Sequence, residues 1–267
     1  MLSQKDYDQL LQIMEESPEK KDLLNRLLTS HQITLSTFSH EVRNPLTLIY
    51  STIQLIETRH PEVFSFEHWD DLHQDLEYLV QLLNELSLYN NGEKLHCTDV
   101  PMTTYLQKIA LSYAASLTDL DIEFSSSIAP DLPVITLDEV KFRQAILNLL
   151  NNARDAVFSK TNASYHVGHT SSEGLSPSIR LSALCSDASE LLIRISDNGC
   201  GISEKDLPNI FQPFITHKEN GTGLGLAVTE RVIRAHHGSV EVESTSSSGT
   251  TFLLRLPVQQ DTKDKSR

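Results

Sequence analysis

The chain has 267 residues, of which 39% are hydrophobic and 22% are charged, the balance of an ordinary globular protein with enough residues to bury a core. Its net charge of −14, with no long basic run, argues against nucleic acid and anionic membrane surfaces as partners. The three cysteines are far apart and no window approaches the roughly eighteen apolar residues of a membrane span, so we expect a cytoplasmic protein with reduced thiols.

The first 29 residues contain short amphipathic stretches that are separated at Ser17-Pro18. They predict a short N-terminal helical extension over residues 1–29. Such an extension could bind a partner or could simply lengthen the helix that follows, and the pattern favours the second alternative.

Residues 30–92 carry two runs in which apolar residues recur at spacings of three and four, which predicts an αα-hairpin. A break is expected at Arg59–Glu62, because Pro61 disfavours helix at the residue before it. One hairpin has too little core to stand alone, so we expect a homodimer in which two hairpins form a four-helix bundle. The apolar positions are Leu35, Phe38, Val42, Leu46, Ile49, Ile53 and Ile56 in the first run and Leu72, Leu76, Leu79, Leu83 and Leu86 in the second.

His40 lies in the first run, two residues from both Phe38 and Val42, so its imidazole should point about 200° away from each and face solvent. Pro45 cannot donate to the carbonyl of Glu41 and should bend the helix one turn beyond His40. A lone surface histidine is usually just a solvated residue. A helix-breaking proline inside a strongly periodic helix is what favours a functional interpretation here.

Helical and strand-like segments interleave from residue 93 to residue 258, before a polar tail at 259–267. They predict a mixed α/β layer in which helices cover a sheet. A polar connection between Ser159 and Ser178 is longer than most in compact domains, and we expect it to be mobile. Helices are predicted at 101–117, at 138–157 and after Gly225, and strands at 121–126, 178–184, 191–197, 239–244 and 250–256.

Several motifs in this region have both a structural and a chemical interpretation. Asn148 and Asn152 share one face of the 138–157 helix, and their amide oxygens suit Mg²⁺ bound with phosphate. Asp197–Gly201 follows a strand and is either a tight turn or a contact for adenine. Gly221–Gly225 is either a flexible loop or a set of backbone N–H groups for phosphates at the start of a helix.

In order and spacing, these motifs resemble those of bacterial sensor histidine kinases over roughly residues 30–258. The resemblance implies an α+β fold: a helical hairpin forming a dimeric four-helix bundle, followed by an α/β sandwich ATP-binding domain of the gyrase and histidine kinase type. The implied domains are a dimerisation and phosphotransfer domain at 30–92 and a catalytic ATP-binding domain at 93–258. The matching segments are the H-box at Phe38–Leu46, the N-box at Asn148–Ala153, the G1 box at Asp197–Gly201, the F-box at Phe211–Phe214, the G2 box at Gly221–Gly225 and a final Gly249–Phe252.

The resemblance implies a soluble kinase that transfers the γ-phosphoryl group of ATP to His40 and then to an aspartate of a response regulator receiver domain. Glu41 is the implied general base, and Asn44 the residue that aligns a water for a phosphatase reaction. Asn152, helped by Asn148, is implied to hold Mg²⁺. The other implied nucleotide contacts are Asp197, Gly199 and Gly201 at the adenine, then Lys218, Gly221, Thr222, Gly223, Leu224 and Gly225 at the phosphates, with Thr251 completing the set.

Asp155 departs from the resemblance, because many members carry Lys or Arg at this position; with Arg154 adjacent, the sequence leaves open which side chain meets the phosphates. One alternative function is a phosphotransfer or scaffold protein with a weakly active nucleotide domain. Another is an ATP-driven conformational machine of the gyrase type. The presence of Asn152, Asp197 and the glycines favours an active kinase over the first, and the second offers no role for His40.

Overall fold

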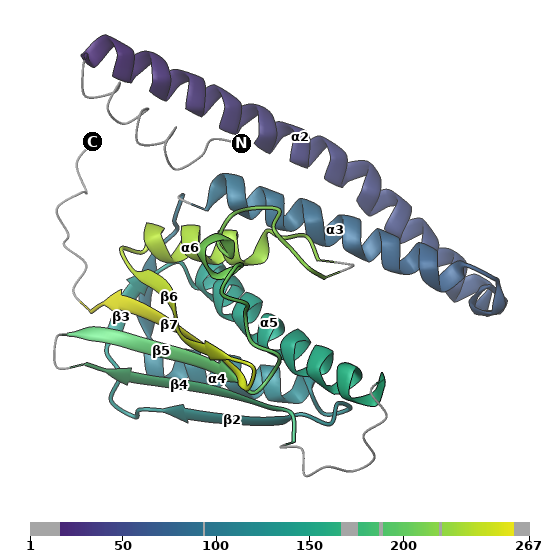
Figure 1. Cartoon of the computed structure of the whole chain (residues 1–267). Coiled ribbons are helices and arrows are strands. Elements are labelled where there is room, and N and C mark those ends of the chain that lie inside the picture. The colour runs from purple at the N-terminus through teal and green to yellow at the C-terminus, as the bar shows by residue number, and fades with distance from the viewer. Residues whose placement is uncertain (1–16, 93, 167–175, 187–188, 219–220, 259–267) are drawn as a thin grey trace. The chain divides into compact units, whose positions relative to one another are not determined.

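The computed structural model describes residues 17–92, 94–166, 176–186, 189–218 and 221–258, and the side chains of most residues from 18 to 40 and of 160–166 lie outside this description. The chain divides into two compact units, Met1–Asn91 and Gly92–Arg267 (Figure 1). Among the described helices, none has the length and apolar character needed to cross a lipid bilayer. The predictions for residues 1–16, for the polar tail and for the mobility of 167–175 fall outside the described residues.

The first unit is a helical hairpin. Helix α2 (Pro18–Arg59) and helix α3 (Trp69–Asn91) are joined by the 3-10 helix η1 (Pro61–Ser65), so the break falls at the predicted proline. Helix α2 begins at Pro18, a residue well suited to the first turn of a helix, and continues without interruption past residue 30, as expected if the N-terminal stretch lengthens the helix that follows.

The hairpin core is built from four of the predicted apolar positions, Leu46, Ile53, Leu76 and Leu83. Ile49, which was expected in this core, is 50% exposed. It lies about 60° around the helix from Leu46, at the margin of the packed stripe. The predicted positions Leu72 and Leu79 are likewise exposed, each at 43%. The hairpin therefore carries several exposed apolar side chains outside its own core: Leu48, Ile49, Leu55, Leu72 and Leu79.

The second unit contains a five-stranded sheet in the order β2-β4-β5-β7-β6, in which β2 and β4 are parallel and the other neighbours are antiparallel. Helix α5 contacts β4, β5 and β7, while α4 contacts β2 and α6 contacts β6. The α/β part of the predicted fold is confirmed. The elements are α4 (Met102–Ser116), β2 (Glu123–Ile128), α5 (Glu139–His166), β4 (Ser178–Cys185), β5 (Glu190–Asp197), α6 (Gly225–Ala235), β6 (Ser239–Ser246) and β7 (Gly249–Pro257).

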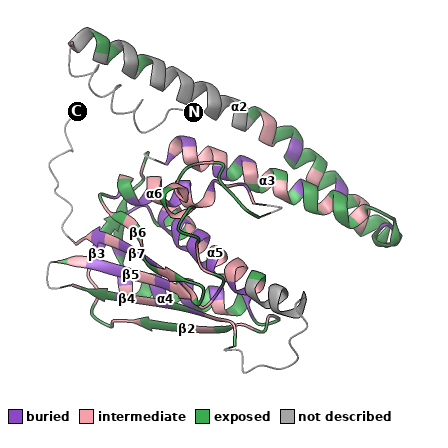
Figure 2. Cartoon of the chain, in the orientation of Figure 1, coloured by how far each residue is buried: buried purple, intermediate pink, exposed green. Residues whose placement is uncertain are grey.

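The core of this unit lies between α5 and the strands that it contacts. Positions buried on α5 include Phe142, Ile146 and Leu149, and the strands alternate between buried and more exposed residues along β4 and β7 (Figure 2). One face of the sheet is therefore packed and the other meets water. The side of α5 that faces away from this core is left to carry polar residues.

Two features of the second unit were not predicted. Strands β1 (Thr98–Pro101) and β3 (Val134–Leu137) form a separate antiparallel pair; each has only four residues, too few to show a clear period. Helix α5 continues to His166, so the connection expected to begin at Ser159 begins later. Residues 159–166 are mostly polar, but they contain no Gly or Pro to end the helix.

Candidate functional site

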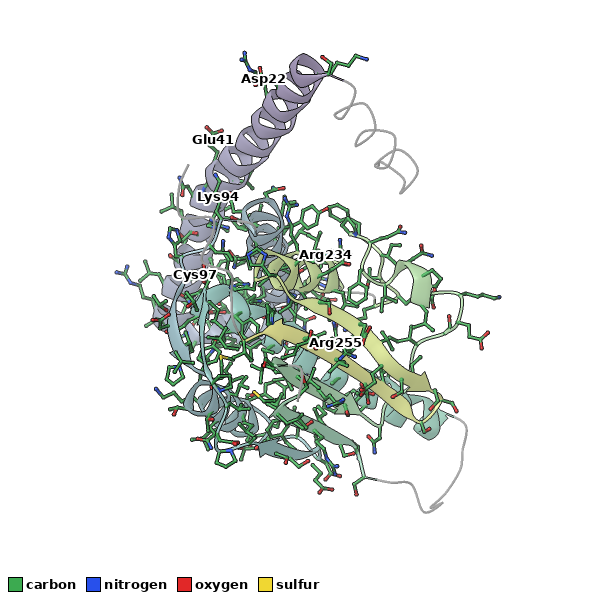
Figure 3. All side chains as sticks on the ribbon, turned by 90° about the vertical axis from the view of Figure 1, so that its left-hand side faces the viewer. Asp22, Glu41, Lys94, Cys97, Arg234 and Arg255 are labelled. Carbon is green, nitrogen blue, oxygen red and sulfur yellow. The ribbon has the colours of Figure 1, made fainter. Side chains whose placement is uncertain are left out.

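The H-box lies in the middle of α2. His40 is helical, but its side chain lies outside the described residues, so its exposure stays a prediction. Glu41 and Asn44 are both exposed, and Glu41 projects from the helix (Figure 3). Pro45 stands inside α2, with helix on both sides. The candidate acceptor histidine is thus followed on the same helix by two accessible polar side chains.

Arg43 is a residue of this turn that the sequence did not single out. Its Nη2 donates to the carbonyl oxygen of Leu83 on α3 at 3.4 Å. The contact joins the turn that follows His40 to the other helix of the hairpin, where Leu83 is also a core residue.

The two N-box asparagines have different surroundings. Asn148 is only 8% exposed; its Oδ1 accepts from Gln144 Nε2 at 3.0 Å, and its Nδ2 donates to the carbonyl oxygen of Gly225 at 3.1 Å. Asn152 is more accessible, and its Oδ1 accepts from Lys218 Nζ at 2.8 Å. Asn148 thus fastens the start of α6 to α5, which favours a packing role over the metal-ligand role that we expected.

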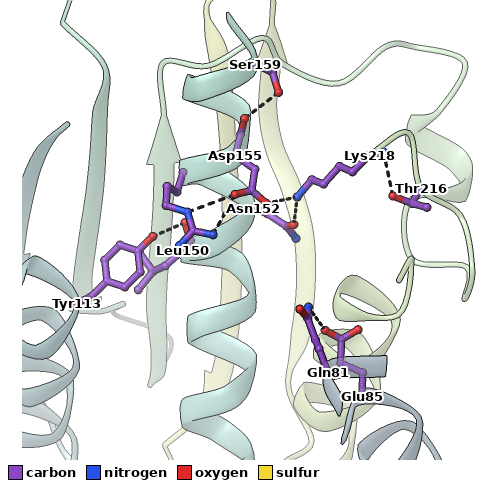
Figure 4. Close-up of polar contacts among 10 residues, drawn as sticks. Gln81, Glu85, Tyr113, Leu150, Asn152, Asp155, Ser159, Thr216 and Lys218 are labelled. Atoms are coloured by element: carbon purple, nitrogen blue, oxygen red, sulfur yellow. Dashed lines mark hydrogen bonds and ion pairs between the residues drawn. The ribbon is translucent and has the colours of Figure 1, made fainter. Parts of the chain in front are cut away.

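Lys218, the side chain predicted to contact the phosphates, reaches two residues of α5. Its Nζ lies 2.7 Å from Asp155 Oδ2, in addition to its contact with Asn152 (Figure 4). The other carboxylate oxygen of Asp155 accepts from Arg154 Nη2 at 3.1 Å. The departure from the kinase pattern at Asp155 therefore lies in the centre of the predicted phosphate region, with a cation on each side.

Tyr113 of α4 supports the same part of α5 from the core side. Its hydroxyl donates to the carbonyl oxygen of Leu150 at 2.8 Å (Figure 4). Burial raises the pKa of Tyr113 to about 12, so the hydroxyl stays protonated and remains a donor near neutral pH.

Asp197 at the end of β5 organises the G1 turn. Its Oδ1 accepts from the backbone N–H groups of Gly199 at 2.8 Å and of Thr250 at 3.3 Å. Asn198 brackets the start of β4: its Oδ1 accepts from Ser178 N and its Nδ2 donates to Ser176 O, both at 2.8 Å. The turn is therefore held by its own side chains.

The G1 glycines are required by packing within the protein. A Cβ on Gly199 would lie 2.5 Å from the backbone carbon of Ala156 on α5. Gly201 has φ +76°, and a Cβ there would lie 1.9 Å from the carbonyl oxygen of Ser246. These glycines let the G1 turn approach α5 and β6 closely. Their predicted role of admitting an adenine ring stays a prediction.

The final motif, Gly249–Phe252, contains two threonines, of which Thr251 was predicted to contact the nucleotide. Thr250 is 4% exposed, its N–H reaches Asp197 and its hydroxyl lies 3.1 Å from that of Thr245. Thr251 donates its hydroxyl to Ser196 at 3.0 Å. Because successive strand residues point to opposite faces, only one of the two threonine side chains can face the Asp197 turn. The β-strand register places Thr250, and not the predicted Thr251, on the side of the Asp197 turn, while a role of Thr251 at the nucleotide stays a prediction.

The G2 box is closed by backbone contacts. Phe214 N donates to Gly223 O at 2.8 Å, and Gly221 N donates to Lys218 O at 3.1 Å. Gly223 has φ +67°, a conformation that suits glycine. Thr222 is buried, with its Oγ1 accepting from Leu224 N at 3.2 Å, and Gly225 then begins α6. These contacts fix the ends of the segment just ahead of α6.

A buried histidine, His236, joins the far end of α6 to the start of α5. Its Nε2 accepts from Asp138 N at 2.9 Å and its Nδ1 donates to Val232 O at 2.7 Å. Burial lowers the pKa of His236, in keeping with a neutral ring. Burial alone would raise the pKa of Asp138, but hydrogen bonds from the backbone N–H groups of His96 and Lys141 outweigh it and lower that pKa.

Successive turns along α5 each contact a different motif. Asn148 bonds to Gly225 of the G2 box, Asn152 bonds to Lys218, and one turn further the carbonyl oxygen of Ala156 accepts from Cys200 N of the G1 box at 3.2 Å. Positions four apart lie on one side of a helix. The structure thus brings the N, G1 and G2 boxes and Lys218 together along one side of α5. Among the described residues, no group of three or more His, Cys, Asp or Glu side chains could hold a metal by itself.

The comparisons with known proteins agree with this arrangement. Residues 137–260 match the family described as histidine kinase-, DNA gyrase B- and HSP90-like ATPases. The chain is 28% identical over 244 residues to the signal transduction histidine-protein kinase AtoS of Escherichia coli K12, covering 91% of this chain and 37% of AtoS. It is 29% identical to the adaptive-response sensory kinase SasA of Microcystis aeruginosa, covering 90% of this chain and 62% of SasA. The chain therefore spans less than two thirds of each of these relatives.

A solved structure of full-length ShkA in complex with AMPPNP matches with a TM-score of 0.62 at 22% identity, covering 84% of this chain and 45% of that one. The histidine kinase AdeS of Acinetobacter baumannii matches with a TM-score of 0.53 at 19% identity, covering 83% of this chain and 98% of AdeS. These two likenesses concern the fold. Together with the sequence relatives, they confirm the resemblance to histidine kinases that the order of the motifs predicted.

Proposed function

We propose that this chain, whose residues 137–260 form an ATPase domain of the histidine kinase type, is an ATP-dependent protein histidine kinase of two-component signalling. The observation that carries the proposal is the alignment of the G2 box, Lys218 and the G1 box along consecutive turns of α5. In a chain whose motifs no longer bind a nucleotide, we would not expect all of these contacts to be retained. Residues 30–92 serve as the dimerisation and phosphotransfer domain, and residues 93–258 as the ATP-binding domain.

In this proposal a ring nitrogen of His40 attacks the γ-phosphorus of ATP, the bond to the bridging oxygen breaks and ADP leaves. Glu41 accepts a hydrogen bond from the other ring nitrogen and so holds the tautomer in which the attacking nitrogen has a free lone pair; as general base it then takes that ring nitrogen's proton when the bond to phosphorus forms. The phosphoryl group then passes to an aspartate carboxylate of a response regulator receiver domain. Asn44, exposed one turn from His40, aligns a water that hydrolyses the phospho-aspartate of the regulator and so releases inorganic phosphate, which is the phosphatase function.

The nucleotide lies over α5 in the proposal. Asp197 accepts a hydrogen bond from the adenine amine at the end of β5, with Thr250 beside it. The backbone N–H groups of Gly221–Gly225 and the ammonium of Lys218 contact the phosphates. Asn152 fits a divalent cation, because its amide oxygen already contacts a cationic group, Lys218 Nζ. Bound Mg²⁺ would neutralise the phosphates during transfer.

The proposed partners follow from surfaces of the first unit. The exposed apolar residues of the hairpin, including Leu48 at 69% and Ile49 at 50%, suit burial against a second copy in a four-helix bundle.

The proposed location is the cytoplasm, where ATP is available and where Cys97, Cys185 and Cys200 would remain the free thiols that they are in the structure.

The test is incubation of the purified chain with Mg²⁺ and ATP labelled in the γ-phosphate, followed by acid and alkali treatment of the labelled protein. We expect an acid-labile, alkali-stable label that His40→Gln removes. His60→Gln is the matched control, because His60 is an exposed histidine of the same hairpin whose side chain has Glu62 as its one described hydrogen-bond partner. ATP binding without any label would instead favour the phosphotransfer scaffold, and ADP release without phosphohistidine would favour a gyrase-type machine.

A further inference from the structure

Asp155 and Asn152 direct one oxygen each at the same cation. Lys218 Nζ lies 2.8 Å from Asn152 Oδ1 and 2.7 Å from Asp155 Oδ2 (Figure 4). The two residues are three positions apart, which places their side chains on one side of α5. A carboxylate and an amide oxygen converging on a positive charge are the ligand types that Mg²⁺ prefers in proteins.

The orientation of the Asp155 carboxylate is set by a second contact. Its Oδ1 accepts from Arg154 at 3.1 Å from Nη2 and 3.3 Å from Nε, which leaves Oδ2 directed to the Asn152 side. A ligand carboxylate that is itself hydrogen-bonded through its other oxygen is a recurrent feature of metal sites. The Asp155 side chain keeps 33% of its surface exposed, so the carboxylate that contacts Lys218 is not sealed from solvent.

Electrostatics makes this carboxylate unfavourable for bare ATP. A negative side chain beside the phosphates repels them unless a cation stands between the two. Arg154 contacts the other oxygen of Asp155, so among the described residues Lys218 supplies the one positive charge on Oδ2, and the proposed function also uses this charge for the phosphates. A divalent cation arriving with the nucleotide offers Asp155 a better partner and frees Lys218 to contact phosphate oxygens.

We propose that Asp155 is a second protein ligand for the divalent cation beside Asn152, and that Lys218 occupies these two oxygens until the cation and nucleotide bind. The inference rests on the proposed function, because it concerns the same ATP site. Its consequence is that Asp155 couples nucleotide binding to the metal: the chain should bind ATP with Mg²⁺ much more tightly than without it.

The experiment is calorimetric titration of the full chain with AMPPNP, once with Mg²⁺ and once with EDTA. The readout is the dissociation constant in EDTA divided by the dissociation constant in Mg²⁺. We expect Asp155→Asn to lower this ratio on the order of tenfold, mainly by weakening binding with Mg²⁺. Binding in EDTA should stay equal or become tighter, since a charge that repels the phosphates is gone. Lys218→Met should weaken binding in both buffers and leave the ratio unchanged or raised.

Glu139→Gln is the matched control, because Glu139 is an acidic residue of the same helix that lies about 24 Å from Asp155 along the axis. It should leave the ratio as in the wild type. An unchanged ratio in Asp155→Asn, or an equal change in both buffers, overturns the inference and leaves Asp155 as a restraint on Lys218. A wild-type chain that binds AMPPNP in neither buffer overturns the proposed ATP site as well.

Discussion

His236, at the end of α6, accepts a hydrogen bond from the backbone N–H of Asp138, at the start of α5, over 2.9 Å. The carboxylate of Asp138 in turn accepts from the N–H of His96, in the segment that leads into β1. One buried imidazole therefore connects the helix that follows the G2 box to the helix that carries the N-box, and through it to the beginning of the second unit.

We expect His236→Ala to destabilise the second unit by about 2–4 kcal/mol, because it leaves the buried N–H of Asp138 without its partner, removes one of the donors to the carbonyl of Val232 and creates a cavity. The measurement is urea unfolding followed by circular dichroism. The neighbouring His237 is exposed and has φ +60°, a conformation that asparagine tolerates, so His237→Asn should change stability by less than about 0.5 kcal/mol. Equal losses in the two variants would contradict this role.

The same histidine should make stability depend on pH. Burial lowers the pKa of His236 in the folded state, so the unfolded chain takes up the proton first as the pH falls. The contribution of His236 to the free energy of unfolding is therefore fully present above the pKa of about 6.5 that the histidine has in the unfolded chain. It is lost as the pH falls below that value toward the lower pKa of the folded state. Urea midpoints measured at about pH 7.5 and about pH 5.5 should differ more in the wild type than in His236→Gln. An identical pH dependence in both would exclude His236 as the cause.

Two glycines of the G2 box should respond differently to alanine. Gly223→Ala places a Cβ 2.6 Å from the backbone carbon of Phe214 at φ +67°, so we expect a loss of at least about 1 kcal/mol in unfolding free energy. A Cβ on Gly225 would lie 3.8 Å from its nearest neighbour outside the local backbone, the side chain of Asn148. Because Gly225 is also the first residue of α6, Gly225→Ala should fold normally. If Gly225→Ala folds but binds AMPPNP poorly, that glycine is needed by the ligand.

Thr250 and Thr251 provide a test of which threonine serves the nucleotide. Thr250→Val removes the hydroxyl beside the Asp197 turn, and we expect the dissociation constant for AMPPNP to rise about tenfold. Thr251→Val loses only a contact with Ser196 and should change the constant less than about twofold. Calorimetry on both variants decides; the reverse order would restore the selection made from the sequence.

Asn44→Ala should lower the rate at which the chain dephosphorylates a phosphorylated receiver domain, while autophosphorylation of His40 is retained. Asn44 is exposed on α2 and makes no contact described in the hairpin core, so the fold should be unaffected. Thr47→Ala, also exposed and one turn along, is the control for both assays. Parallel loss of both activities in Asn44→Ala would show that Asn44 does not divide them.

The period of apolar residues predicted the hairpin and the main strands, because local packing decides which face of each element is buried. The contact of His236 with Asp138 could not be predicted in this way, since it joins residues 98 positions apart whose types carry no signal individually. The choice between Thr250 and Thr251 needed the strand register, which the sequence leaves open by one residue. The role of Asp138 as a helix cap could have been predicted, because an aspartate just before a helix is a common cap; its carboxylate accepts from Lys141 N.

The uninterrupted course of α2 has a mechanical consequence. From Pro18 to His40 the backbone stays helical, which makes this stretch a rod of about 33 Å rather than a tether. A torque or an axial push applied near Pro18 would be delivered to the turn of His40 with little loss. Pro45 removes one rung of the hydrogen-bond ladder just beyond that turn. The rod is therefore most compliant next to His40, the proposed acceptor of the phosphoryl group.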